Sequence, residues 1–136
     1  MRLLIVDDDA DLRAALDDAL SDQHEVKTAA TAVEALALKP ERFDLILTDH
    51  RMPVMSGLEL GRLLHERGVA VPVVLMSSDP DLRGPAARVD FFDFLAKPFG
   101  FSQLHGILAR IARKIGHSAP SSWSIAAGMR SRKPAN

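Results

Sequence analysis

Polar residues at the ends of short apolar runs constrain the fold of this chain more than any other sequence feature. Four runs end in this way: residues 3–6 at Asp7 and Asp8, 45–48 at Asp49, 73–76 at Ser77, and 94–96 at Lys97. If the runs are parallel strands of one sheet, their polar ends meet at its carboxyl edge, where open α/β sheets bind ligands. Three carboxylates, a hydroxyl and an ammonium group at that edge predict a site for a metal ion and a phosphoryl group.

Helical patterns alternate with these strands and with a short alternating strand at residues 25–29. We expect the last strand to run from Phe91 to Ala96, and Ser77 to begin the loop after the strand before it. Each of four helices has its own signal: Asp8 and Asp9 as N-cap candidates before Leu12, Leu16 and Leu20; capping boxes at Thr31 with Glu34 and at Ser56 with Glu59; and an apolar stripe at Leu104, Ile107, Leu108 and Ile111. Alternation of this kind predicts an α/β fold with five parallel strands, right-handed crossovers and helices on both faces of the sheet.

Two segments depart from this regular pattern. Asp79 and Pro80 have the form of a helix start, but Gly84-Pro85 interrupts the segment after about one turn, so we expect a shortened or broken fourth helix. From residue 117 onward Ser, Pro, Ala, Gly and basic residues dominate, which predicts a flexible basic tail or linker at 117–136. Residues 1–116 are therefore predicted to form the folded domain.

Composition limits the setting in which the chain acts. All 18 acidic residues precede residue 117, and the acidic character of that part argues against nucleic acid as its partner. No apolar stretch approaches the roughly 20 residues of a membrane span. The first strand follows Met1-Arg2 at once, without room for a signal peptide, and the chain has no cysteine. These features predict a cytoplasmic protein that does not bind membranes.

The three carboxylates favour a hard cation. Acidic side chains that converge repel one another, and a divalent ion removes the repulsion. Oxygen ligands without cysteine or paired histidine favour Mg²⁺ or Mn²⁺ over zinc. Structural roles stand beside this interpretation, since one acid in the run Asp7 to Asp9 can cap a helix and Asp49 can form a buried ion pair with Lys97.

The histidines are interpreted as structural. His24, His65, His105 and His117 lack the spacing of metal ligands, so we expect them at the surface. His50 follows Asp49 on a strand, and its side chain should therefore point to the opposite face of the sheet.

In these residues the chain resembles the response-regulator receiver domains of two-component signalling. The resemblance covers residues 1–116 and rests on one ordered set of motifs: Asp7-Asp8, Asp49 with Met52-Pro53 and Gly57, Ser77, and Lys97-Pro98-Phe99. It implies a flavodoxin-like (βα)5 doubly wound sandwich with strand order 2-1-3-4-5. Val89-Asp90 and the Gly84-Pro85 break depart from the family pattern, at the face that would contact a target.

The resemblance also implies a reaction. Asp49 would take a phosphoryl group from a phosphohistidine on a sensor histidine kinase or a phosphotransfer protein. Asp7, Asp8, Asp49 and the backbone carbonyl of Arg51 would hold Mg²⁺, or Mn²⁺ in its place.

A conformational switch would follow the transfer. Ser77 and Lys97 would bind the phosphate oxygens, and Phe94 would rotate and alter the surface that a downstream protein target reads. Packing in the apolar core is the alternative role for Phe94. The Lys97–Pro98 peptide bond is expected to be cis, as in similar proteins.

Other interpretations of the whole chain stay open. A pseudo-receiver would keep the fold as an interaction module without phosphorylation. A haloacid-dehalogenase-like phosphatase also begins with a strand that ends in Asp-x-Asp, which Asp7 and Asp9 match, but Asp11 and the lack of a late acidic pair do not fit it. We expect a phosphorylated receiver that turns over no separate substrate, with homodimerisation left open.

Overall fold

A computed structural model of the chain describes residues 1–83 and 88–116. The chain divides into two compact units, Met1–Ala96 and the residues from Lys97 onward, and each is described by itself. The Gly84-Pro85 break and the predicted tail at 117–136 lie outside the described residues.

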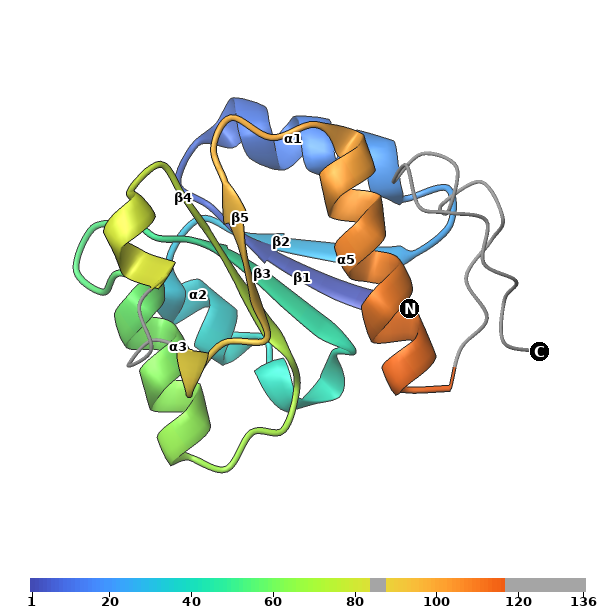
Figure 1. The fold of residues 1–136 in the computed structure, drawn as a ribbon. Helices are drawn as coiled ribbons and strands as arrows, with labels where there is room; N and C mark the ends of the chain where they lie inside the picture. The colour runs from blue at the N-terminus through green and yellow to red at the C-terminus, as the bar shows by residue number, and fades with distance from the viewer. Residues whose placement is uncertain (84–87, 117–136) are drawn as a thin grey trace. The chain divides into compact units, whose positions relative to one another are not determined.

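The first unit is built on one parallel five-stranded sheet in the order β2-β1-β3-β4-β5 (Figure 1). Its strands are β1 (Arg2–Val6), β2 (Glu25–Ala29), β3 (Leu45–Asp49), β4 (Val73–Ser77) and β5 (Asp93–Ala96). The predicted fold and strand order are confirmed. In the register, Val6 pairs with Thr48 and Asp49 pairs with Met76. The polar ends of β1, β3 and β4 therefore leave the sheet at the same edge.

In the described part of this unit, the strands are connected by α1 (Ala10–Leu20), α2 (Ala32–Ala37) and α3 (Gly57–Glu66). Asp9 is the N-cap of α1, and its side chain accepts hydrogen bonds from the N–H groups of Asp11 and Leu12. Short 3₁₀ turns occupy Pro40–Arg42 and Pro80–Arg83, the second of which matches the single turn expected before Gly84.

The two predicted capping boxes differ in the structure. At α3 the box is complete, because Ser56 accepts from the Glu59 N–H and Glu59 accepts from the Ser56 N–H. These hydrogen bonds, chiefly the one from the Ser56 backbone, hold the pKa of the Glu59 carboxyl below its usual value. At α2 the Thr31 side chain caps the helix by accepting from the Glu34 N–H. The Glu34 carboxylate, however, accepts from the N–H of Ala30 rather than from that of Thr31.

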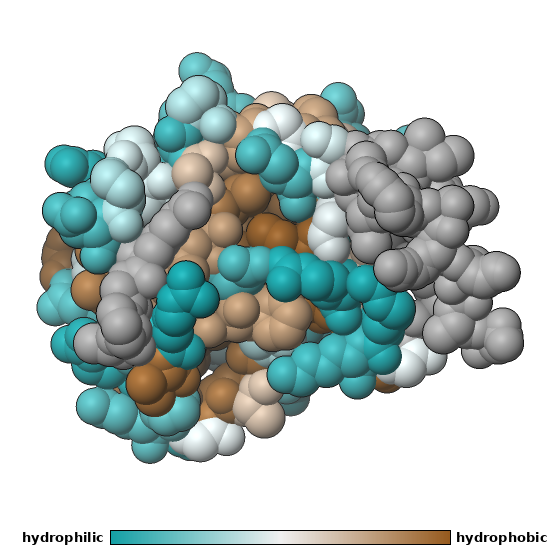
Figure 2. All heavy atoms as spheres, viewed as in Figure 1, coloured by the Kyte–Doolittle hydropathy of each residue, from teal (hydrophilic) through white to brown (hydrophobic). Residues whose placement is uncertain are grey.

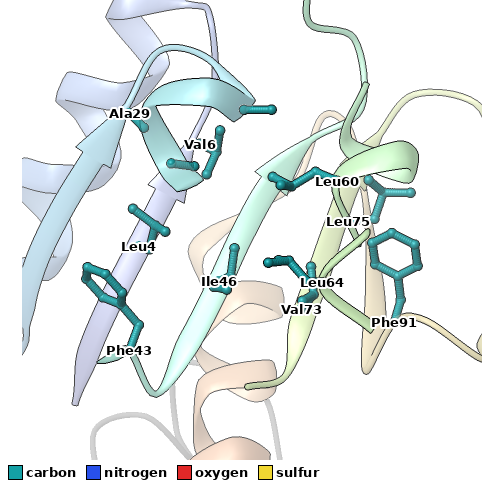
Figure 3. Packing of buried hydrophobic residues seen from close by; sticks show 12 residues of the cluster. Leu4, Val6, Ala29, Phe43, Ile46, Leu60, Leu64, Val73, Leu75 and Phe91 are labelled. Carbon is teal, nitrogen blue, oxygen red and sulfur yellow. The ribbon is translucent and has the colours of Figure 1, made fainter. Parts of the chain in front are cut away.

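Apolar side chains of β1, β3 and β4 pack under α2 and α3 (Figure 3). This buried cluster consists of Leu4, Val6, Ala29, Ala32, Ala35, Phe43, Ile46, Leu60, Leu64, Val73, Leu75 and Phe91. The alternate side chains of the strands point to the other face, where α1 lies with Leu16 and Leu20 buried (Figure 1). The fully buried strands explain the apolar runs of the sequence.

Local expectations need three corrections. β5 begins at Asp93 rather than at Phe91, although Phe92 still donates a backbone hydrogen bond to Val73. Ser77 is the last residue of β4 rather than the first residue of a loop. His24 is 9% exposed, so the prediction of a surface position is wrong; the turn after α1 folds it under the chain, beside the Met1 amino group.

The second unit opens with a cis peptide bond between Lys97 and Pro98 and continues into α5 (Phe101–Lys114). Gln103 accepts a hydrogen bond from the Gly100 N–H at the start of this helix. In neither described range is any helix long and apolar enough to cross a membrane. The surface of the described residues in Figure 2 mixes hydrophilic and hydrophobic side chains.

Among the described large apolar residues Val54 is the most exposed, at 95%, and its backbone has a φ of 71°. We expect Val54→Gly to stabilise the protein by about 0.5–1 kcal/mol. A left-handed backbone costs an L-residue roughly 1–2 kcal/mol, and the larger freedom of glycine in the unfolded chain cancels about 0.5–1 kcal/mol of that gain. Urea denaturation followed by circular dichroism measures the change.

Val33 offers the matched control for this substitution. It is 63% exposed and lies inside α2, so Val33→Gly should destabilise the protein by up to about 1 kcal/mol. Equal effects of the two variants would contradict a strain specific to residue 54.

Candidate functional site

Three carboxylates gather where β1 and β3 end. One oxygen from each of Asp7, Asp8 and Asp49 lies within 4.8 Å of the other two. Asp7 is fully buried and Asp49 is 6% exposed, whereas Asp8 is exposed to solvent. The cluster therefore has two members inside the protein and one at its surface.

Asp7 is held by its neighbours on both sides. Its N–H donates to the carbonyl of Ala29 at 3.0 Å, which extends the β1–β2 ladder by one residue. Its Oδ1 accepts a hydrogen bond of 2.9 Å from the N–H of Asp9, the residue that caps α1. The strand and the helix start together fix where this carboxylate points.

Asp49 is positioned by the sheet and by the loop that follows it. Strand β3 pairs with β1 on one side and with β4 on the other. After the strand, the chain returns through a loop that the Gly57 N–H closes on the His50 carbonyl at 2.9 Å. A Cβ built on Gly57 would lie 2.1 Å from the Asp49 carbonyl oxygen, so only glycine lets the loop approach this closely.

Of the other predicted site residues, Lys97 belongs to the second unit and the rest belong to the first. Ser77 ends β4, and its hydroxyl oxygen accepts from the Asp79 N–H at 2.9 Å. Phe94 is half-buried on β5, with its ring centroid 5.7 Å from that of Phe91 and the Arg88 guanidinium 6.0 Å from it. Arg51 is exposed in the loop after β3.

The donor set of the acidic cluster fits a hard divalent cation. All three side-chain donors are carboxylate oxygens, the ligand type that Mg²⁺ and Mn²⁺ prefer. Burial of Asp7 and Asp49 strengthens their mutual repulsion, since charges interact more strongly away from water. A cation at this point would offset that repulsion.

Two residues contact this cluster in ways that the sequence did not predict. Arg13 on α1 donates from Nη1 to the backbone carbonyl of Asp7 at 2.7 Å. Its position four residues after the N-cap Asp9 is the only sequence signal for this contact. Gly57 was noted as part of a motif, but its packing against Asp49 depends on the loop conformation.

Comparison with known proteins decides the family. The family model described as "Response regulator receiver domain" matches residues 3–109. The chain belongs to this family. The resemblance predicted from the polar strand ends is thus confirmed, and with it a place in two-component signalling.

Receiver domains of longer proteins are among the relatives. The chain is 35% identical over 118 residues to the response regulator protein PilR of Pseudomonas aeruginosa, a match that covers 82% of this chain and 26% of PilR. It is 36% identical over 121 residues to the sensor histidine kinase TmoS of Ectopseudomonas mendocina, covering 84% of this chain and 12% of TmoS. The chain therefore spans only about a quarter of PilR and about an eighth of TmoS.

One similar solved structure is a receiver domain that holds magnesium. The receiver domain of the sensor histidine kinase PA1611 from Pseudomonas aeruginosa, with magnesium coordinated in its active-site cleft, is 28% identical and superposes with a TM-score of 0.69. That match covers 80% of this chain and 94% of the PA1611 domain. Receiver domains bind Mg²⁺ in their acidic cluster, and this receiver domain has such a cluster in Asp7, Asp8 and Asp49.

Proposed function

We propose that this receiver domain is phosphorylated on Asp49 by a phosphohistidine of a sensor histidine kinase or a phosphotransfer protein. The observation that carries the proposal is the cluster of Asp7, Asp8 and Asp49 within 4.8 Å in a chain of this family. Asp7 is fully buried and has one oxygen engaged by the Asp9 N–H. Asp49 retains some exposure at the end of a central strand, which favours it as the acceptor.

The transfer follows from the groups present. A carboxylate oxygen of Asp49 attacks phosphorus, the P–N bond to the donor histidine breaks, and its electron pair returns to the imidazole, which takes a proton from solvent. The new bond makes an acyl phosphate on Asp49. No second substrate is turned over in this scheme.

Asp7, Asp8, Asp49 and the Arg51 carbonyl would hold Mg²⁺, or Mn²⁺ in its place. The cation, when bound, offsets negative charge on the phosphoryl oxygens. The Ser77 hydroxyl and the Lys97 ammonium group would bind those oxygens after transfer.

Signalling would then depend on Phe94. Its ring contacts both the Phe91 ring and the Arg88 guanidinium, so rotation of Phe94 toward Ser77 would disturb both contacts. A downstream protein target would read that change. We further propose that residues 1–116 act as the receiver unit, that 117–136 form a tail or linker, and that the protein acts in the cytoplasm.

Intact mass spectrometry tests the proposed acceptor. We expect the protein incubated with Mg²⁺ and acetyl phosphate to gain the mass of one phosphoryl group, because the P–O bond of the donor breaks and acetate leaves. Asp49→Asn should lose this gain. Asp9→Asn is the matched control and should keep it, because asparagine caps a helix as well as aspartate does.

Three outcomes would contradict the proposal. A mass gain that persists in Asp49→Asn would place the phosphoryl group elsewhere. No gain in the native protein, with no binding of beryllofluoride, would support a pseudo-receiver. Steady hydrolysis of a general phosphate ester that is lost in Asp7→Asn would support a phosphatase.

A further inference from the structure

Arg13 closes a ring of hydrogen bonds around the start of α1. Its Nη1 donates to the Asp7 carbonyl at 2.7 Å, and its backbone N–H donates to the Asp9 carbonyl at 3.0 Å. The Asp9 N–H in turn donates to Oδ1 of Asp7 at 2.9 Å. Both the main chain and the side chain of Asp7 are therefore tied to the first turn of the helix.

This contact is unusual for a helical arginine. Arginine side chains at the start of a helix are placed unfavourably with respect to the helix dipole and usually extend into water. Arg13 is instead half-buried and turned back toward the strand that precedes its own helix. The guanidinium brings a permanent positive charge to the residue whose carboxylate is the most deeply buried of the cluster.

We propose that Arg13 is a positioning residue for the divalent-cation site. By holding the Asp7 carbonyl, it fixes the turn that carries Asp7 and Asp8, so that both carboxylates are in place before the cation arrives. This role rests on the cation site of the proposed function and adds to it a residue outside the ligand set.

Arg13 would preorganise the cation site through a strong hydrogen bond. An arginine–carbonyl hydrogen bond involves a charged donor, and such bonds are about twice as strong as neutral ones. Groups that orient metal ligands without touching the metal typically change the affinity about 10- to 100-fold when they are removed. An arginine that merely joined α1 to β1 would change the stability of the cation-free protein and leave the affinity unchanged.

Three substitutions separate these roles. Arg13→Met keeps much of the aliphatic side chain and removes both charge and donor; Arg13→Gln keeps a donor without charge; Arg13→Lys keeps charge and one donor group. Arg62→Met is the matched control, because Arg62 is an exposed arginine on α3 whose Nε lies 3.9 Å from Asp90. Each variant is studied as the full chain.

Isothermal titration with Mg²⁺ alone and thermal unfolding without Mg²⁺ are the two measurements. We expect Arg13→Met to weaken Mg²⁺ binding about 10-fold or more. The Mg²⁺ affinity of Arg13→Gln should lie between those of Arg13→Met and the native protein, and Arg13→Lys should recover most of the native affinity. Arg62→Met should bind as the native protein does. In acetyl phosphate assays, Arg13→Met should need more Mg²⁺ for half-maximal rate but reach the native rate at saturation.

The proposal is overturned if Arg13→Met binds Mg²⁺ with native affinity, whatever its thermal stability. It is also overturned if Arg13→Lys is as defective as Arg13→Met and both unfold at equally lowered temperatures, since the role would then be structural. Failure of the proposed function looks different: native protein that binds Mg²⁺ but gains no phosphoryl group would refute phosphorylation of Asp49 and leave the Arg13 comparison intact. Native protein that does not bind Mg²⁺ would refute both.

Discussion

Gly57→Ala is expected to damage the fold and the acidic cluster together. The added methyl group would lie 2.1 Å from the Asp49 carbonyl oxygen and 2.9 Å from Cδ1 of Leu75. The nearest atom belongs to the backbone of a central strand, so it cannot move aside as a flexible side chain could. Overpacking of this kind costs about 1–3 kcal/mol and occasionally more, and we expect the upper end of that range.

The displacement should also reach the cation. Relief of the clash moves either the loop that contains Arg51 or the end of β3 that carries Asp49, and both are proposed to hold Mg²⁺. Urea denaturation should show a lower midpoint, and titration with Mg²⁺ on the folded protein should show weaker binding. Native Mg²⁺ affinity in a destabilised Gly57→Ala protein would mean that the site does not depend on this close approach.

Gly68→Ala separates backbone strain from the clash. Gly68 follows α3 with a φ of 74° and has no atom within 4 Å of a Cβ position. Alanine there should cost about 0.5–1 kcal/mol. Its left-handed backbone costs roughly 1–2 kcal/mol, and the smaller freedom of alanine in the unfolded chain offsets about 0.5–1 kcal/mol of that cost. Mg²⁺ binding should stay unchanged.

The second large effect is expected where α3 meets the residues before β5. Phe91 is 6% exposed and belongs to the buried cluster (Figure 3). Its ring fills the space beside Gly61, whose added Cβ would lie 2.3 Å from Cζ of that ring. Phe91→Ala should destabilise the protein by about 3–5 kcal/mol, because it removes a buried aromatic side chain from the core cluster. Urea denaturation measures this loss.

A double-mutant cycle shows whether Gly61 is glycine because of Phe91. In the native background Gly61→Ala should destabilise the protein, because the ring is enclosed by the cluster and cannot yield freely. In the Phe91→Ala background the same substitution should stabilise it by about 1 kcal/mol, the usual gain of alanine over glycine inside a helix. The same sign in both backgrounds would contradict a specific fit between the two residues.

Much of this fold could be predicted because its signals are local. Apolar runs predicted the strands, and Asp9 and Ser56 marked helix starts that the structure places within a residue of expectation. The convergence of Asp7, Asp8 and Asp49 followed from one topological rule, since parallel strands bring their carboxyl ends to one edge.

What escaped prediction depends on contacts between residues distant in sequence or on the details of a turn. No pattern in the sequence links Gly61 to Phe91, because their contact arises only when α3 packs beside the segment before β5. Glu34 matched a capping box, but in the turn before α2 its carboxylate accepts a hydrogen bond from the Ala30 N–H, one residue before the N-cap. His24 is polar and follows a helix, yet the turn after α1 folds it inward beside the Met1 amino group.

The central position of β3 bears on how long a signal could last. Strands bonded on both sides exchange their amide hydrogens last, often only when the whole domain unfolds, whereas loops open many times faster. Asp49 ends such a strand, while Asp8 and Arg51 lie in exposed segments that follow strands. A phosphoryl group on Asp49 would therefore be attached to a backbone that opens less often than the loops around it. The lifetime of the acyl phosphate would then be set by how often those loops open to admit water.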